Sequence, residues 1–197
     1  MDSFFTMSKV AIFASGAGSN ADRILQFLTE KQSPIQIDCL LTNKREAGIY
    51  KVADKFDVPI FCFSNTAFAE GDSVLEFLLT RNIRWIVLAG FLRKIELSLV
   101  EEFEDKIFNL HPSLLPKYGG EGMYGSKVHE AVLAAGESES GISIHLVNSE
   151  FDKGKILFQA KCEIEKGQTV DELSKKIQKL EHANFASVIE HFIIKNY

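Results

Sequence analysis

The segment VAIFASGAGSNADRILQFLT (Val10–Thr29) begins with an unbroken apolar run, passes through a glycine-rich turn and continues with apolar residues at helical spacing. Val10–Ser15 is therefore predicted to be a buried strand, and Asn20–Thr29 an amphipathic helix. Gly16 and Gly18 permit the tight turn between them. A strand, a glycine loop and a helix in this order are typical of the first unit of a doubly wound α/β fold.

The same alternation of apolar runs and amphipathic stretches continues through the first half of the chain. Strands that alternate with helices form βαβ units, so we expect a parallel sheet. Because the apolar runs have no alternating polar side, both faces of that sheet should be covered. The predicted strands are Ile35–Thr42, Pro59–Phe63, Trp85–Ala89 and Ile107–Leu110, and the predicted helices are Ala47–Phe56, Ser73–Thr80, Leu97–Phe103 and Ser126–Ala135.

The C-terminal part has a different pattern. Ile142–Val147 and Ile156–Ile164 alternate more clearly, as strands with one solvent-facing side do. Only the residues Asn148–Lys155 join them, which is too short a connection for a helical crossover. These two strands are therefore predicted to pair antiparallel.

A long closing helix is predicted over Thr169–Ile193, where Thr169 and Glu172 have the spacing of a capping box. The expected fold class is therefore α/β, with a doubly wound, mostly parallel, Rossmann-like sheet and an antiparallel C-terminal strand pair. We expect a single domain over residues 1–197.

Composition excludes several classes of protein. The chain is 46% hydrophobic and 25% charged, which argues against disorder and coiled coil. Its net charge of -5 gives no basic excess for nucleic acid or anionic lipid. No apolar run approaches the ~20 residues of a membrane span, and residues 1–10 lack the apolar core of a secretory signal, so a cytoplasmic location is expected. The cysteines are widely spaced with no CxxC pair, so no metal site is expected; they are Cys39, Cys62 and Cys162.

The glycine loop has the features of an anion site. The free N–H groups of a helix start can bind a phosphate, and Ser19 and Asn20 add a hydroxyl and an amide. Gly16–Ala21 also fits the dinucleotide pattern G-x-G-x-x-A. However, the second strand ends in Thr42–Lys44 without the acid that would hold a ribose, and Asp38 lies inside it. A single phosphate group is the better ligand, and a capped turn without a ligand is the alternative.

The segment after Ile107 contains the residues best suited to catalysis. Asn109 and His111 are two positions apart in an extended chain and therefore project to the same side. Pro112 favours extended geometry at His111. An amide beside an imidazole can stabilise a developing oxyanion and move a proton. The alternative is a structural histidine at a strand end.

Asp152 lies in the connection between the last two predicted strands, close to Gly154. If its carboxylate reaches His111, it should raise the pKa of the imidazole above its ~6.5 reference value. The alternative is an ordinary turn residue. The other histidines are expected to be structural or solvated: His129, His145, His182 and His191.

The glycine turn Ala89–Lys94 follows a buried strand and carries apolar residues and bases, as the rim of a pocket for a flat aromatic ligand would. The motifs SGAGSN, AGFLRKI and FNLHPSLLPKY and the Asp152 loop occur in the order and spacing of the folate-dependent formyl transferases. The chain resembles this family over about Lys9–Asn196, and within it the glycinamide ribonucleotide formyltransferases. It departs from many members at Gly119–Gly125, a longer glycine-rich loop.

The resemblance implies transfer of a formyl group from 10-formyltetrahydrofolate to the amine of 5-phosphoribosylglycinamide in purine biosynthesis, with no metal. Both partners would be small molecules, and the protein would be a monomer or homodimer. The implied catalytic residues are Asn109, His111 and Asp152; the implied substrate-binding residues are Gly18, Ser19 and Asn20 for the phosphate and Glu181 for the ribose; the implied folate-binding residues are Leu92, Arg93, Lys94, Ile95, Asn109, Asn148, Ser149, Glu150, Phe151 and Asp152.

Two other functions stay open on the residues alone. One is a nucleotide-binding sensor without chemistry, although a passive binder would not need Asn109, His111 and Asp152. The other is a dinucleotide-dependent oxidoreductase, although the acid expected after the second strand is missing.

Overall fold

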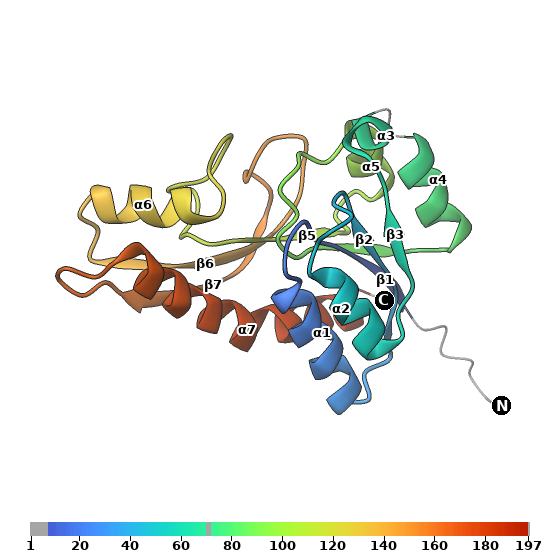
Figure 1. Cartoon of the computed structure of the whole chain (residues 1–197), viewed down its shortest axis with the longest axis horizontal. Coiled ribbons are helices and arrows are strands. Elements are labelled where there is room, and N and C mark those ends of the chain that lie inside the picture. The colour runs from blue at the N-terminus through green and yellow to red at the C-terminus, as the bar shows by residue number, and fades with distance from the viewer. Residues whose placement is uncertain (1–7, 70–71, 197) are drawn as a thin grey trace.

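The structure of the protein is a computed structural model that describes residues 8–69 and 72–196. Its core is a 7-stranded sheet in the order β3-β2-β1-β4-β5-β6-β7 (Figure 1). Neighbouring strands from β3 to β5 are parallel, and β6 runs antiparallel to both β5 and β7. The strands are β1 Ser8–Phe13, β2 Ile35–Thr42, β3 Ile60–Cys62, β4 Trp85–Leu88, β5 Ile107–His111, β6 Glu139–Leu146 and β7 Ile156–Glu163.

Helices cover both faces of the sheet. The helices are α1 Ser19–Glu30, α2 Ile49–Phe56, α3 Asn65–Ala69, α4 Asp72–Thr80, α5 Leu97–Glu102, α6 Ser126–Ala134 and α7 Val170–Lys195. Helices α1, α2 and α7 lie on one side, and α3, α4 and α5 lie on the other (Figure 1). Because side chains alternate along a strand, Val10 and Ile12 pack under the first group while Ala11 and Phe13 pack under the second. The predicted coverage of both faces is thus confirmed.

The α/β fold class and the antiparallel C-terminal strand pair are also confirmed. The capping box at the start of α7 is present, since Glu172 N donates to Thr169 Oγ1 (3.3 Å) and Thr169 N donates to Glu172 Oε2 (2.8 Å). Two local predictions were incomplete. The short helix α3 was not predicted, and β6 begins at Glu139 rather than at Ile142.

The prediction that β6 has a solvent-facing side is wrong. Residues 140–146 are buried, because α7 covers one face of β6, while the segment after β5 and the β6–β7 connection cover the other. The alternation that suggested a wet face comes from Ser143 and His145, which are buried here together with the apolar side chains.

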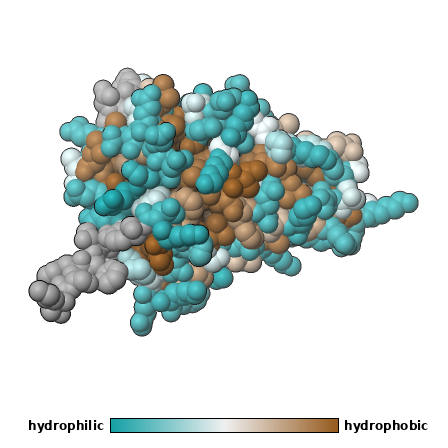
Figure 2. Space-filling view, turned by 180° about the vertical axis from the view of Figure 1, so that it is seen from behind, coloured by the Kyte–Doolittle hydropathy of each residue, from teal (hydrophilic) through white to brown (hydrophobic). Residues whose placement is uncertain are grey.

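The outer surface is mixed. Seen from the side opposite Figure 1, hydrophobic residues gather in the middle of the molecule and hydrophilic residues surround them (Figure 2). None of the helices in the described part of the chain is long and apolar enough to cross a membrane. The prediction about a secretory signal depends mainly on residues 1–7, which lie outside the described residues.

The strand order brings the functional segments together at the carboxyl ends of the central strands β1 and β4. The connections leave β1 and β4 in opposite directions, so their carboxyl ends form a topological switch point. The loops after these two strands are tied together there: Ser15 N donates to Gly90 O (3.0 Å), and Leu92 N donates to Ser15 Oγ (3.2 Å). The glycine loop and the Ala89–Lys94 turn therefore form one side of a single opening.

Candidate active site

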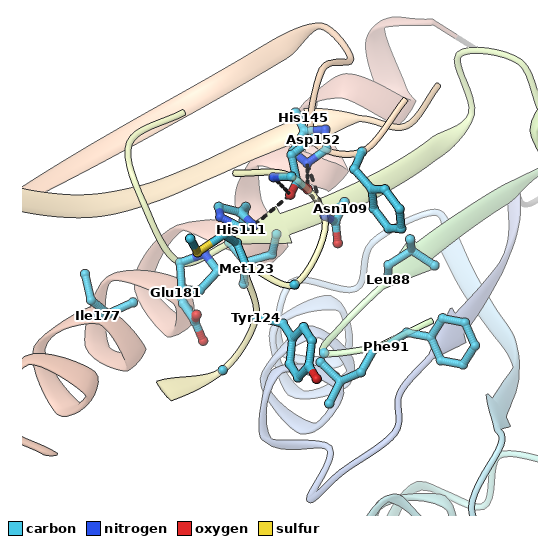
Figure 3. A pocket seen from close by; sticks show the side chains of 18 of the residues that line it. Leu88, Phe91, Asn109, His111, Met123, Tyr124, His145, Asp152, Ile177 and Glu181 are labelled. Atoms are coloured by element: carbon cyan, nitrogen blue, oxygen red, sulfur yellow. Dashed lines mark hydrogen bonds and ion pairs between the residues drawn. The ribbon is translucent and has the colours of Figure 1, made fainter. Parts of the chain in front are cut away.

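A cavity of about 410 Å³ lies beside the carboxyl ends of β4 and β5. Its size is in the range of small-molecule sites. The walls come from β4, β5, β6, α1, α6, α7 and the loops that follow the strands (Figure 3). Most of the sequence-predicted site residues line it: Asn20, Leu92, Arg93, Lys94, Ile95, Asn109, His111, Asn148, Glu150, Phe151, Asp152 and Glu181. Gly18, Ser19 and Ser149 are not among the lining residues.

Asn109, His111 and Asp152 meet at the wall of the cavity, as the sequence analysis expected. Asn109 and His111 project from the end of β5 on the same side, and Asp152 comes from the β6–β7 connection (Figure 3). His111 Nδ1 lies 3.4 Å from Asp152 Oδ2, and Asn109 Nδ2 donates to Asp152 Oδ1 (3.4 Å). The carboxylate therefore contacts both the imidazole and the amide, although it lies 41 positions after His111 in the sequence.

The prediction that the pKa of His111 is raised is wrong. Burial lowers the pKa of His111, and it outweighs the Asp152 carboxylate and the Tyr118 carbonyl, which act in the opposite direction. His111 is only 4% exposed, so its charged form loses most of its hydration. His111 Nε2 donates to Tyr118 O (2.7 Å), which means that this nitrogen carries a proton in either charge state.

Asp152 is held in its ionised form by several neighbours. Burial alone would raise its pKa, but a hydrogen bond from His145, the charge of His111 and the Gly120 N–H together hold the pKa of Asp152 below its ordinary value. Gly120 N donates to Oδ2 at 2.9 Å. The glycine-rich loop that departs from the family pattern thus supplies a backbone donor to the carboxylate.

His145 was expected to be structural or solvated, and the structure instead places it in the site. It is 2% exposed and lines the cavity from β6. Its Nε2 lies 3.1 Å from Asn109 Nδ2 and 3.5 Å from Asp152 Oδ1. The signal in the sequence was the antiparallel pairing itself, because β5 and β6 place His145 directly opposite Asn109.

The other end of the cavity holds an amide and a carboxylate. Asn20 Nδ2, in the first turn of α1, donates to Glu181 Oε2 on α7 (2.9 Å). Burial raises the pKa of Glu181, and the hydrogen bond from Asn20 partly offsets this effect. Gly18 is the N-cap of α1 with φ 76°, and a Cβ there would lie 3.1 Å from Ile49 Cα. Gly18 therefore brings the loop against α2 and orients the helix start.

The rim near β4 is apolar and partly exposed. Leu92 is 49% and Phe151 39% exposed, although both are large hydrophobic residues. Lys94 Nζ lies 5.3 Å from the centroid of the Phe151 ring, so the turn after β4 and the β6–β7 connection touch across the rim. Exposed apolar side chains beside a cavity suit a flat aromatic ligand.

The loop before α6 also contributes to the cavity, through Gly120, Gly122, Met123, Tyr124 and Gly125. His129, on α6, is 5% exposed, and its Nδ1 has no hydrogen-bond partner. From the sequence, His129 was expected to be structural or solvated. Over the residues that the structure describes, no group of three or more His, Cys, Asp or Glu side chains could hold a metal ion.

Fold and cavity together define an α/β protein in which one carboxylate contacts an imidazole and an amide at a topological switch point. The Formyl transferase family model matches residues 8–189. The chain therefore belongs to the formyl transferase family.

Relatives that are named for one particular formyl transferase are similar over nearly the whole chain. Phosphoribosylglycinamide formyltransferase of Bacillus subtilis is 33% identical, with 95% of each protein covered. The chloroplastic enzyme of that name from Arabidopsis thaliana is 35% identical over 92% of this chain and 64% of its own length. The chain thus spans somewhat less than two thirds of this plant relative. The crystal structure of the Bacillus halodurans protein has a TM-score of 0.88 and 30% identity, covering 96% of this chain and 97% of that one. The resemblance inferred from the motifs is confirmed.

Proposed function

We propose that the protein transfers a formyl group from 10-formyltetrahydrofolate to the amine of 5-phosphoribosylglycinamide, giving the N-formyl product in purine biosynthesis. The observation that carries this proposal is that Asn109, His111 and Asp152 converge on one cavity wall (Figure 3). The similar proteins named phosphoribosylglycinamide formyltransferase support the choice of acceptor.

The two ends of the cavity suit two different small molecules. At one end, the start of α1 with Asn20 suits the phosphate of the ribonucleotide, and the Glu181 carboxylate suits its ribose hydroxyls. At the other end, the Leu92–Ile95 turn and Phe151 suit the pterin ring. The amine and the formyl group would then meet beside Asn109 and His111.

In the proposed reaction the acceptor amine attacks the formyl carbon, and a tetrahedral oxyanion forms. The bond from this carbon to the folate nitrogen then breaks, and the amine proton passes to that nitrogen. Asn109 and His111 stabilise the oxyanion, the first as a hydrogen-bond donor and the second as imidazolium. Asp152 favours the charged imidazole, since it acts against the effect of burial on His111.

The purified protein should convert the two substrates in a coupled measurement of folate absorbance and product mass. Formate released without the ribonucleotide would indicate a hydrolase, and binding of both molecules without turnover would indicate a sensor. His111→Ala separates catalysis by this site from a contaminating activity, because only the former is lost. Absence of product with both substrates at saturation would contradict the proposal.

We further propose that the enzyme works in the cytoplasm, as a monomer or homodimer, on small molecules alone. Its net charge of -5 supports the last point, because it offers no general attraction for nucleic acid. Sedimentation analysis of the purified chain measures the oligomeric state.

A further inference from the structure

We propose that Tyr118 is a positioning residue for His111, and that Glu137 holds Tyr118 in place from outside the cavity. The inference rests on the proposed function for its catalytic meaning, but its structural part rests on contacts between these residues. Neither Tyr118 nor Glu137 lines the cavity of the candidate active site. The site residues predicted from the sequence include neither of them.

The backbone carbonyl of Tyr118 binds the imidazole directly. His111 Nε2 donates to Tyr118 O (2.7 Å), and Nδ1 of the same ring lies 3.4 Å from Asp152 Oδ2. Both ring nitrogens therefore face oxygen atoms that accept hydrogen bonds. Only the imidazolium, which has two N–H groups, can donate to both oxygens. The Tyr118 carbonyl thus favours the same charged form as the Asp152 carboxylate does.

A neutral ring has a single N–H, so the two acceptors then compete for it. The contact with Tyr118 O is the shorter of the two, which places the hydrogen on Nε2. If the carbonyl moved away, Asp152 would be the remaining acceptor of the pair, and the hydrogen would move to Nδ1. The position of this hydrogen therefore reports how closely Tyr118 is held against His111.

The residues after Tyr118 contact the other member of the pair. Gly120 N donates to Asp152 Oδ2 (2.9 Å). Between them, a Cβ added to Gly119 would lie 2.5 Å from Leu115 Cδ2 and 3.2 Å from Asp152 Cβ. Gly119 therefore allows the close approach of this segment. Residues 118–120 contact both the imidazole and the carboxylate, so a displacement of Tyr118 affects the pair as a unit.

The backbone of Tyr118 needs to be held in its conformation. Its φ of 57° lies in the left-handed region, which a tyrosine rarely adopts. Such a conformation persists only where the surroundings fix it. The ring of Tyr118 packs against the apolar cluster formed by α6, β6 and α7. Immediately before it, Lys117 O accepts from Ser113 Oγ (2.7 Å).

Glu137, just after α6, supplies the polar part of this support. Tyr118 Oη donates to Glu137 Oε1 (2.9 Å), and Lys117 Nζ lies 2.8 Å from the same oxygen. The hydrogen bonds from Lys117 and Tyr118 lower the pKa of Glu137, so the carboxylate stays ionised and remains a good acceptor at neutral pH. One tyrosine thus connects a partly exposed carboxylate to the buried imidazole.

Other charged groups act on His111 by a different route. Burial lowers the pKa of His111, the Asp152 carboxylate and the Tyr118 carbonyl act in the opposite direction, and the charge of His145 lowers it. On α6, the charge of His111 also lowers the pKa of His129, after the larger effect of burial. In the described part of the chain, Glu137 is hydrogen-bonded by Lys117 and Tyr118 alone, so its effect on His111 should pass through Tyr118.

Nitrogen-15 NMR of the full chain tests the structural step without any substrate. Tyr118→Phe removes the hydroxyl and keeps the ring. We expect the neutral His111 ring to carry its hydrogen on Nδ1 more often than in the wild type, and the pKa of His111 to fall further. Lys117→Met is the matched control, because it removes the other donor to the same Glu137 oxygen, and it should leave both readouts unchanged. A His111 tautomer and pKa that are unchanged in Tyr118→Phe would overturn the proposal.

Kinetics test the catalytic step. Tyr118→Phe and Glu137→Ala should each lower kcat by roughly threefold to tenfold, as the loss of one hydrogen bond would. KM for both substrates should change little, because neither residue lines the cavity. Glu137→Gln keeps an oxygen acceptor for Tyr118 and should retain most of the activity that Glu137→Ala loses.

The outcomes separate positioning from simple stabilisation. Variants that are less stable but have an unchanged kcat and an unchanged His111 would contradict the proposal. A shifted His111 tautomer with an unchanged kcat would overturn the catalytic step alone. If Tyr118→Phe does not fold, Glu137→Ala decides the structural step by the same NMR measurement. If the wild type shows no formyl transfer, the proposed function fails, while the NMR result still decides whether Tyr118 positions His111.

Discussion

Asn20, at the start of the first helix, donates a 2.9 Å hydrogen bond to Glu181, in the middle of the last helix. This contact joins the glycine loop to α7 at one end of the cavity. Burial raises the pKa of Glu181, so the folded protein binds a proton there more tightly than the unfolded chain does. The charged carboxylate therefore costs stability at neutral pH, while it is the form best suited to ribose hydroxyls.

Glu181→Gln should separate these two effects. The variant keeps an acceptor for Asn20 but removes the buried charge, so its free energy of unfolding at pH 7 should exceed that of the wild type. The difference should shrink as the pH falls and Glu181 becomes protonated. KM for the ribonucleotide should rise roughly tenfold, the cost of one hydrogen bond to a charged group. Urea denaturation and steady-state kinetics measure both quantities, with the exposed Glu163→Gln as the control. A less stable Glu181→Gln would contradict the argument.

Replacing the imidazole or the amide should remove most of the activity. His111→Ala and Asn109→Ala should each lower kcat by at least about 10²-fold, since the loss of an oxyanion donor costs that much. Circular dichroism should show the native α/β spectrum in both variants. Turnover close to the wild-type rate in either one would refute the assigned role of that residue.

The fold could be predicted because β1, β2 and β4 are mainly apolar and are separated by helical patterns. The hydrophobic pattern reports burial, so it located these elements to within two residues. Helix α3 was missed because five residues are too few to show a helical period. The buried state of β6 was missed because it depends on α7 and on the segment after β5, which are distant in the sequence and which no local pattern contains.

The part of the site that depends on neighbours in the sequence could also be predicted. Asn109 and His111 are close in sequence, and strand geometry alone places them on one side. His145 becomes a neighbour of Asn109 only through the β5–β6 register. The direction of the His111 pKa shift could not be derived from sequence, because it depends on how far burial exceeds the effect of Asp152.

The loop conformation at Gly18 should be sensitive to any side chain. Gly18 has φ 76° and an added Cβ would lie 3.1 Å from both Cα and Cβ of Ile49, whereas Gly136 has φ 68° and open space around it. Gly136→Ala should cost about 1 kcal/mol for the backbone conformation alone, and Gly18→Ala about 2–3 kcal/mol because a close contact is added. Urea denaturation compares the two. Equal losses would show that the neighbouring helix yields freely. Titration calorimetry should also show weaker ribonucleotide binding only in Gly18→Ala.

The charge on His111 should depend on the Asp152 carboxylate. Burial lowers the pKa of His111 and the Asp152 carboxylate opposes that effect, so Asp152→Asn should lower the pKa further. The imidazolium needed for oxyanion stabilisation then becomes scarcer near neutral pH, and kcat should fall, with partial recovery as the pH is lowered. The asparagine oxygen can still accept from Gly120 N–H, so the loop should keep its position. NMR titration of His111 gives the shift directly. Glu150→Gln, in the same connection and paired with Lys153, should leave the His111 titration in place. A His111 pKa that is unchanged in Asp152→Asn would show that the carboxylate holds the imidazole in position without affecting its charge.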